Sequence, residues 1–263
     1  MRCSDDALVL RRTPFRETSL LLHLFTRQEG VLTAIARGVR ATGRSAPGME
    51  RAALASFHTL FVTRHARSAQ ALSTLTGVEI RHPRHGLLHR AAALLAAQLM
   101  QEICYRFLPP QEASPDLFAL LEWAWDRLDE EADPLSVLGI FLGRMLRGLG
   151  YGWRSDCCAG CGRREALRYF SVKQGQVVCA PCAAPYAGPG ARALLPHPAQ
   201  TLFFLGDSLY AVVQQLEWTT DFISLPPEEK AVLYRIGMAS LLRLGKAALL
   251  ADPPFRQMIG LDS

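Results

Sequence analysis

The chain has 263 residues, of which 49% are hydrophobic and 20% are charged, a composition that is typical of a folded globular protein and excludes a disordered chain. This length has room for two domains. The longest apolar run, 87–100, is interrupted by His89, Arg90 and Gln98 and is shorter than the roughly 18 residues that cross a bilayer. The N-terminus also shows no signal-peptide pattern, so we expect a soluble cytoplasmic protein without a membrane partner.

The net charge of +5 is unevenly distributed along the chain. Residues 1–85 contain 13 arginines against 6 acidic residues, whereas the remainder contains 16 basic and 18 acidic residues. An arginine-rich first domain joined to a slightly acidic second part indicates an anionic partner for the first domain. The alternatives are that the basic side chains only keep a small domain in solution, or that genomic composition favours arginine over lysine.

The first part of the chain shows short apolar or β-prone runs, one of which alternates in part, with turn residues between them. The expected strands cover 7–10, 18–25, 31–36, 57–63 and 71–79. A loop at 37–49 with three glycines and three arginines separates the third strand from the fourth. Five short strands within residues 1–82 fit a barrel of the OB type, which binds single strands or oligosaccharides, although the pattern alone does not separate it from other small barrels.

Beyond Arg81-His82-Pro83 the hydrophobic period becomes helical. Ser114-Pro115 and Asp133-Pro134 each place a capping residue before a proline at the first helical position. The expected helices cover 86–107, 114–131, 133–148, 198–218 and 226–245. We therefore expect an α+β protein in which residues 83–263 form a helical domain with an inserted segment at about 157–185.

The inserted segment contains two Cys-x-x-Cys pairs, which are separated by 17 residues and consist of Cys158, Cys161, Cys179 and Cys182. Paired cysteines at such spacing are typical of a tetrahedral zinc site. Gly162 allows a positive φ directly after the first pair. Two β-prone runs between the pairs predict a hairpin that carries one pair at each end. Because four thiolates leave no open coordination position, we predict one structural zinc ion.

Two alternatives to a metal site are weaker for these four cysteines. Two disulfides would need an oxidising compartment, and four free thiols would not need the paired spacing. Other residues are also weaker metal candidates. Cys157 adjoins Cys158, but Cys158 completes the spacing, so we interpret Cys157 as a spare thiol. His85 and His89 have the i,i+4 spacing of a helical metal site and follow His82, although a histidine- and arginine-rich helix start explains them better.

No common catalytic or nucleotide-binding motif occurs in the chain. We therefore expect a nucleotide-independent binding protein and not an enzyme. Guanidinium groups pair bidentately with phosphate, so the candidate nucleic-acid contacts are arginines of the first turn and of the loop, namely Arg11, Arg12, Arg16, Arg37, Arg40 and Arg44. Phe15 lies nearby, and Phe57 and Phe61 are expected to share a strand face, where core packing is favoured over base stacking.

Several short motifs occur in the order of a known family. The N-terminal ones are Ala-Leu-Val-Leu at 7–10, Glu-Thr-Ser-Leu at 17–20, Leu-Phe-Thr at 24–26 and the run from Gly30 to Ala-Arg-Gly-Val-Arg at 36–40. They resemble the N-terminal domain of RecO, the bacterial recombination mediator. Leu-Gly-Tyr-Gly at 149–152 followed by the two cysteine pairs, and Leu-Gly-Lys at 244–246 with Phe-Arg-Gln at 255–257, resemble later parts of the same family.

The resemblance implies an OB-fold that binds single- and double-stranded DNA, a helical domain with a zinc segment, and annealing of complementary strands without ATP. It also implies, as partners, RecR and the acidic C-terminal tail of the single-strand-binding protein, so that RecA is loaded in the RecF-type pathway at the nucleoid. The family's basic loop corresponds here to Arg37, Arg40 and Arg44, without lysine. Arg144 and Arg147 share a helix face and are candidates for the tail site, with a plain surface pair as the alternative.

Two other classes of protein remain open at this point. A zinc-ribbon transcription or RNA-binding factor would share the charge asymmetry and the cysteine pairs, but it would prefer one sequence or RNA. A metal-dependent hydrolase would need an open metal position, which four thiolates do not leave.

Overall fold

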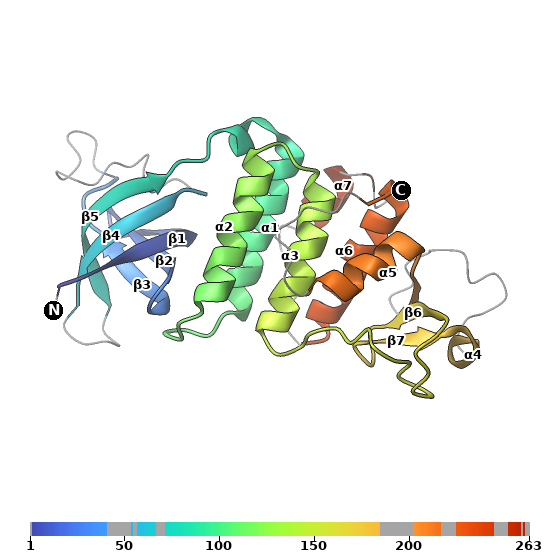
Figure 1. The fold of residues 1–263 in the computed structure, drawn as a ribbon. Coiled ribbons are helices and arrows are strands. Elements are labelled where there is room, and N and C mark those ends of the chain that lie inside the picture. The colour runs from blue at the N-terminus through green and yellow to red at the C-terminus, as the bar shows by residue number, and fades with distance from the viewer. Residues whose placement is uncertain are drawn as a thin grey trace. The chain divides into compact units, whose positions relative to one another are not determined.

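The computed structural model describes residues 2–40, 54, 57–66, 72–184, 202–216, 225–244, 252–258 and 260 (Figure 1). The chain divides into two compact units. The first consists of residues 1–131 and 249–258, and the second consists of residues 132–248 and 259–263. Within the described residues, no helix is both long and apolar enough to span a membrane.

The first unit contains a closed five-stranded barrel, labelled β1 to β5 in Figure 1. Its strands are β1 (Arg2–Phe15), β2 (Ser19–Thr26), β3 (Gly30–Ala36), β4 (Thr59–His65) and β5 (Ser73–His82). Their order is β1-β2-β3-β5-β4, and β4 pairs back to β1. The predicted OB-type barrel is therefore confirmed. The first strand is longer than expected because its N-terminal half pairs with β4 and its C-terminal half pairs with β2. The apolar run at 7–10 does not reveal this long-range pairing.

The barrel core follows the two-residue period of its strands. Alternate residues point inward, as with Leu22 and Leu24 on β2 and Leu60 and Val62 on β4, and all four are at most 1% exposed. The apolar runs of β1 and β2 do not themselves alternate, so it was the five short runs with turn residues between them that predicted the barrel.

The helices of the first unit begin with a short 3₁₀ turn, Gly86–His89, followed by α1 (Ala91–Phe107), α2 (Pro115–Asp129) and α7 (Asp252–Met258). The expected single helix over 86–107 is wrong in its first turn, because Arg90 adopts an extended conformation and separates the 3₁₀ turn from α1. Helix α7, which packs against α1, was not expected from the sequence.

A buried arginine fastens α2 to the barrel. The side chain of Arg84 has no exposed surface and donates hydrogen bonds to Asp126 on α2 at 2.6 Å and to the carbonyl oxygen of Phe57 at 2.9 Å. Arg27 at the end of β2 also donates to Glu122 of α2 at 2.7 Å. A buried charge such as that of Arg84 needs these partners, so its bonds fix the position of α2 against the barrel.

The loop between α1 and α2 approaches the β2–β3 turn closely. The N–H of Gln111 donates to the carbonyl oxygen of Val31 at 2.9 Å. Gly30 has a φ of +74°, and a Cβ at this position would lie 2.1 Å from the carbonyl oxygen of Glu112. Only glycine satisfies both the backbone conformation and the contact.

We therefore expect Gly30→Ala to destabilise the protein by about 3 kcal/mol, from a strained backbone and a steric overlap with Glu112. The measurement is urea denaturation of the full chain, followed by far-ultraviolet circular dichroism. Gly38→Ala is the matched control, because Gly38 has a φ of +73° but a Cβ there meets no atom within 4 Å. The control is expected to cost about 1 kcal/mol, and equal costs for the two variants would contradict the steric argument.

The second unit combines helices with a small sheet. Its elements are α3 (Pro134–Gly148), β6 (Leu167–Ser171), β7 (Gln176–Cys179), α4 (Ala180–Ala183), β8 (Leu202–Phe204), α5 (Asp207–Gln215) and α6 (Pro227–Leu242). The helix expected over 198–218 is wrong at its start, because Leu202–Phe204 is a strand that pairs with β6 and the helix begins only at Asp207. The α+β class with a hairpin inserted among the helices is confirmed.

Glycines bring α3 and α6 close together. A Cβ on Gly139 of α3 would lie 2.9 Å from Leu233 of α6, and a Cβ on Gly237 of α6 would lie 2.7 Å from Leu142 of α3. Each glycine thus accommodates a leucine of the opposite helix, which allows dense packing. At the start of α3, the Asp133 carboxylate accepts the N–H of Ser136 at 2.8 Å and caps the helix as expected.

Candidate metal centre and nucleic-acid interface

The four cysteines of the two pairs lie together in the second unit. The Sγ atoms of Cys158, Cys161, Cys179 and Cys182 all lie within 4.8 Å of one another. The Sγ atoms of Cys161 and Cys179 are 3.7 Å apart. Four sulfurs at about 2.3 Å from one tetrahedral ion are separated by roughly 3.8 Å. The cluster therefore fits a single metal ion, and the described residues contain no second group of three or more histidine, cysteine or acidic ligands that fits one.

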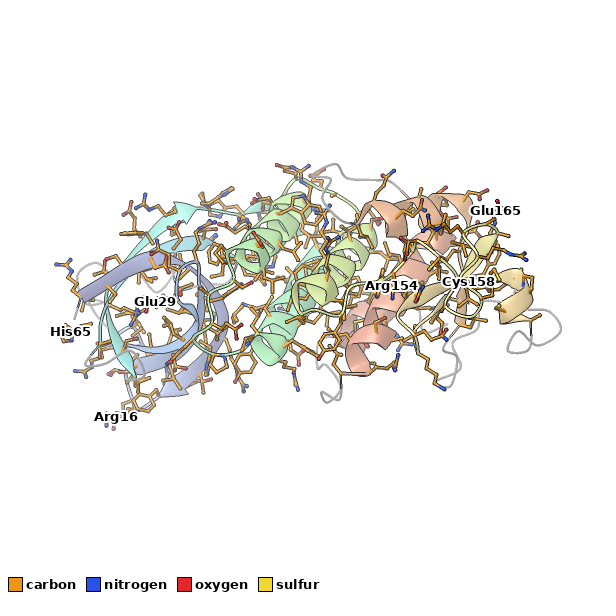
Figure 2. The ribbon with its side chains drawn as sticks, turned by 60° about the horizontal axis from the view of Figure 1, so that its bottom comes forward. Arg16, Glu29, His65, Arg154, Cys158 and Glu165 are labelled. Atoms are coloured by element: carbon orange, nitrogen blue, oxygen red, sulfur yellow. The ribbon has the colours of Figure 1, made fainter. Side chains whose placement is uncertain are left out.

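The hairpin of β6 and β7 positions these thiols. Figure 2 labels Cys158 beside the strands of this part of the chain. The segment from Arg154 to Ala159 runs alongside β7. The N–H of Val177 donates to the carbonyl oxygen of Arg154 at 3.0 Å, and the N–H of Ala159 donates to the carbonyl oxygen of Val177 at 3.0 Å. This pairing carries Cys158 to Cys179, the last residue of β7. The second pair ends on the short helix α4 that follows directly.

The backbone around Cys158 favours a thiolate. Burial alone raises the pKa of this thiol, but N–H groups of Cys179, Gly160 and Cys161 outweigh that effect and lower the pKa to about 6. The N–H groups of Gly160 and Cys179 each lie 3.3 Å from the sulfur. Hydrogen bonds with Cys161 and Cys179 instead raise the pKa of Cys182 to about 12, as expected where neighbouring thiols share protons. A thiolate is the form that binds a metal.

The remaining metal candidates lie outside this cluster. The Sγ of Cys157 is 3.5 Å from the side-chain nitrogen of Gln176 and does not join the four sulfurs. The ring of His85 makes an edge contact with the ring of His58, with 5.4 Å between the ring centroids. Nε2 of His82 lies 3.7 Å from a carboxylate oxygen of Asp126.

Three of the predicted DNA-binding arginines gather at one end of the barrel. A groove of about 860 Å³ lies there and is lined by Phe15, Arg16, Glu17, Thr18, Ser19, Ile35, Arg37, Gly38 and Leu72. These residues come from the β1–β2 turn, the end of β3 and the start of β5. Arg40 donates from its side chain to the carbonyl oxygen of Arg16 at 3.2 Å. Arg16 projects away from the barrel in Figure 2.

The other three predicted arginines are placed differently. Arg11 is exposed, donates to the hydroxyl of Tyr105 on α1 at 3.4 Å, and lies 5.2 Å from the centre of that ring. Arg12 donates to the carbonyl oxygen of Leu54 at 3.2 Å. Neither lines the groove. Arg44 lies outside the described residues.

The aromatic residues near these arginines fall into two environments. Phe57 precedes β4 with a φ of +78°, so the expectation that it shares a strand face with Phe61 is wrong. Phe57 is 2% exposed and packs against Trp125, which agrees with the favoured core role. Phe15 lines the groove together with Arg16, its neighbour in the sequence.

The comparisons with known proteins agree along most of the chain. The family model described as "Recombination protein O N terminal" matches residues 1–84, and "Recombination protein O C terminal" matches residues 88–225. The protein named "DNA repair protein RecO" of Cellvibrio japonicus is 39% identical over 58% of this chain and 62% of its own length. The protein of that name from Myxococcus xanthus is 34% identical over 69% of this chain and 72% of its own length. The one from Geobacter metallireducens is 32% identical over 72% of this chain and 77% of its own length. The chain belongs to the RecO family of DNA repair proteins.

Proposed function

We propose that this protein binds single- and double-stranded DNA at the arginine-bearing end of its barrel and anneals complementary strands without ATP. The observation that carries the proposal is the groove lined by Arg16 and Arg37, with Arg40 bonded to the same turn. Guanidinium groups suit phosphate oxygens, and contacts of this kind carry no sequence information.

The charge of the groove accounts for annealing in physical terms. Two DNA strands repel one another through their phosphates, and arginines that neutralise phosphates lower this repulsion and release counterions. Base pairing then supplies the favourable free energy. The protein needs no nucleotide hydrolysis in this scheme and acts as a binding protein, not as an enzyme.

Family membership supports a further part of the proposal. We infer that the protein acts in the RecF-type recombination pathway with RecR and the acidic tail of the single-strand-binding protein, and so helps RecA onto coated strands. In the second unit, Arg144 and Arg147 on α3 are both half-buried, which is compatible with a site for an acidic peptide. Burial lowers the pKa of Arg144.

We also propose that the four cysteines hold one structural zinc ion. Zinc is the metal most often bound by four thiolates at this spacing, and such a site leaves no position for a substrate. The hairpin is joined to the rest of the second unit by several contacts. Tyr210 of α5 donates to the carbonyl oxygen of Ser155 at 3.2 Å, and Arg243 donates to that of Val172. Metal binding is thus expected to stabilise this unit as well as the hairpin.

Gly160 provides a test of the metal site that leaves every ligand in place. A Cβ at this position would lie 3.0 Å from the Sγ of Cys182. We expect Gly160→Ala to weaken zinc binding by roughly tenfold, the scale of effects from groups that orient ligands, in a competition titration with a chromogenic chelator. Gly175→Ala in the β6–β7 turn is the control for hairpin strain, because Gly175 has a φ of +64° but a Cβ there meets no atom within 4 Å, and we expect it to weaken zinc binding less than Gly160→Ala does. An unchanged affinity in Gly160→Ala would contradict the proposed ligand arrangement.

The proposed function is tested by annealing of two complementary labelled oligonucleotides in the absence of ATP. The strands are used bare and coated with single-strand-binding protein. We expect the protein to accelerate annealing in both cases and for unrelated sequences alike. No acceleration on either substrate would overturn the proposal, and a strong preference for one sequence or for RNA would favour a zinc-ribbon binding factor.

A further inference from the structure

The groove at the end of the barrel has an apolar side as well as a basic one. Phe15, Ile35 and Leu72 line it together with Arg16 and Arg37. The side chain of Leu72 is 51% exposed and, with Phe15 and Ile35, gives the groove an accessible apolar side. Phosphate binding alone does not require apolar residues in such a groove, so these side chains need a separate explanation.

Packing among the described core residues of the barrel does not explain Phe15. The buried barrel cluster includes Val9 and Leu22 and the hydrophobic residues packed against it, but neither Phe15 nor Leu72 belongs to it. Phe15 is half-buried at the last position of β1, where it pairs with Ser19. An aromatic ring at this place is therefore accessible from the groove.

The guanidinium group of Arg16 lies beside the ring of Phe15, 5.4 Å from the ring centre. Arg11 lies at a similar distance, 5.2 Å, from the ring centre of Tyr105, but it also donates a hydrogen bond to the hydroxyl of that ring. Arg16 is exposed, so its guanidinium group can reach a phosphate next to the ring of Phe15.

The turn that carries these two residues is held in place. Arg16 has a φ of +54°, a left-handed conformation that residues other than glycine rarely adopt. Arg40 bridges the turn, because its N–H donates to the carbonyl oxygen of Thr18 at 2.9 Å and its side chain donates to that of Arg16 at 3.2 Å. Such a constraint preorganises the ring and the guanidinium for a ligand.

We propose that Phe15 stacks on an unpaired base while Arg16 and Arg37 bind the phosphates beside it. An aromatic ring next to guanidinium groups is the arrangement by which proteins bind single strands without sequence preference. Bases inside a duplex are already stacked on both faces and do not reach such a ring. The groove therefore selects unpaired over paired DNA. This inference rests on the proposed DNA binding and specifies which of the two forms of DNA the groove prefers.

The test compares three labelled ligands on the full-length protein: oligo(dT), an abasic strand of the same length and a duplex of the same length. We expect wild type to bind oligo(dT) more tightly than the abasic strand. Phe15→Ala is expected to weaken oligo(dT) binding by roughly tenfold, and to leave the binding of the abasic strand and the duplex unchanged. The salt dependence is expected to stay the same, because the arginines still neutralise the same phosphates.

Two further variants separate stacking from structure. Phe15→Tyr keeps an aromatic face and is expected to retain wild-type affinity. Phe61→Ala removes another half-buried ring that lies under an arginine of the same barrel but does not line the groove, and it is expected to bind all three ligands as wild type does. Thermal unfolding monitors the integrity of each variant.

The outcomes separate this inference from the proposed function. The inference is overturned if wild type binds oligo(dT) and the abasic strand equally, a comparison that needs no variant and so does not depend on Phe15→Ala folding. It is also overturned if Phe15→Ala weakens all three ligands to the same degree. In both cases DNA binding by the arginines stands. If wild type binds none of the three ligands, the proposed function itself is wrong.

Discussion

Replacing Cys158 and Cys161 by serine in one chain is expected to release about one zinc ion per molecule and to unfold the β6–β7 hairpin. The variant removes two of the four sulfurs that lie within 4.8 Å of one another. Without the ion, Cys179 and Cys182 no longer have partners that hold the two ends of the hairpin together. Apparent binding free energies of structural zinc reach about 10–16 kcal/mol in small peptides, so the loss exceeds what a short hairpin supplies by itself.

The measurements are metal analysis of the purified protein and its thermal unfolding. The second unit is expected to lose stability with the hairpin, because β8 pairs with β6 and Arg168 of β6 contacts Asp207 at the start of α5. Cys157→Ser is the matched control, since this neighbouring thiol lies outside the cluster. Wild-type protein without bound zinc would show that the metal assignment is wrong.

Reversing the charge of Arg16, Arg37 and Arg40 to glutamate is expected to weaken single-strand binding by at least about a hundredfold at low salt. Two of these residues line the groove, and the third holds its turn. The slope of log K against log salt is expected to become shallower by roughly 0.7 for each phosphate that the variant no longer neutralises on single strands. Fluorescence anisotropy over a series of salt concentrations measures both quantities.

The control for this experiment changes the same amount of charge elsewhere. Arg154, Arg163 and Arg164 are exposed residues of the second unit, and their reversal to glutamate leaves the groove intact. We expect the control to reduce affinity less than the groove variant does and to keep the wild-type slope. Equal reductions in affinity would mean that overall charge, and not the groove, governs binding. An unchanged slope in the groove variant would exclude its arginines as phosphate contacts.

Features with a short-range signal could be predicted from the amino-acid sequence alone. The barrel was predictable because its strands are short β-prone runs with turn residues between them, a signal that spans only a few positions. The cysteine cluster was predictable because each Cys-x-x-Cys turn aims two sulfurs at one point, so that only two turns must meet. Proline at the start of α2 and α3 likewise marks the helix within a single dipeptide.

Features that depend on residues far apart in the chain required the folded molecule. Leu202–Phe204 is a strand and not the start of a helix because β6 offers it a pairing partner more than 30 residues earlier. The predicted arginines divide between the groove, Tyr105 of α1 and the carbonyl oxygen of Leu54, although all were equally plausible contacts in the sequence. Phe15 lies in the groove only because β1, β3 and β5 meet at one rim of the closed barrel. Closure of the barrel sets these neighbours, and no local pattern encodes which strand ends meet.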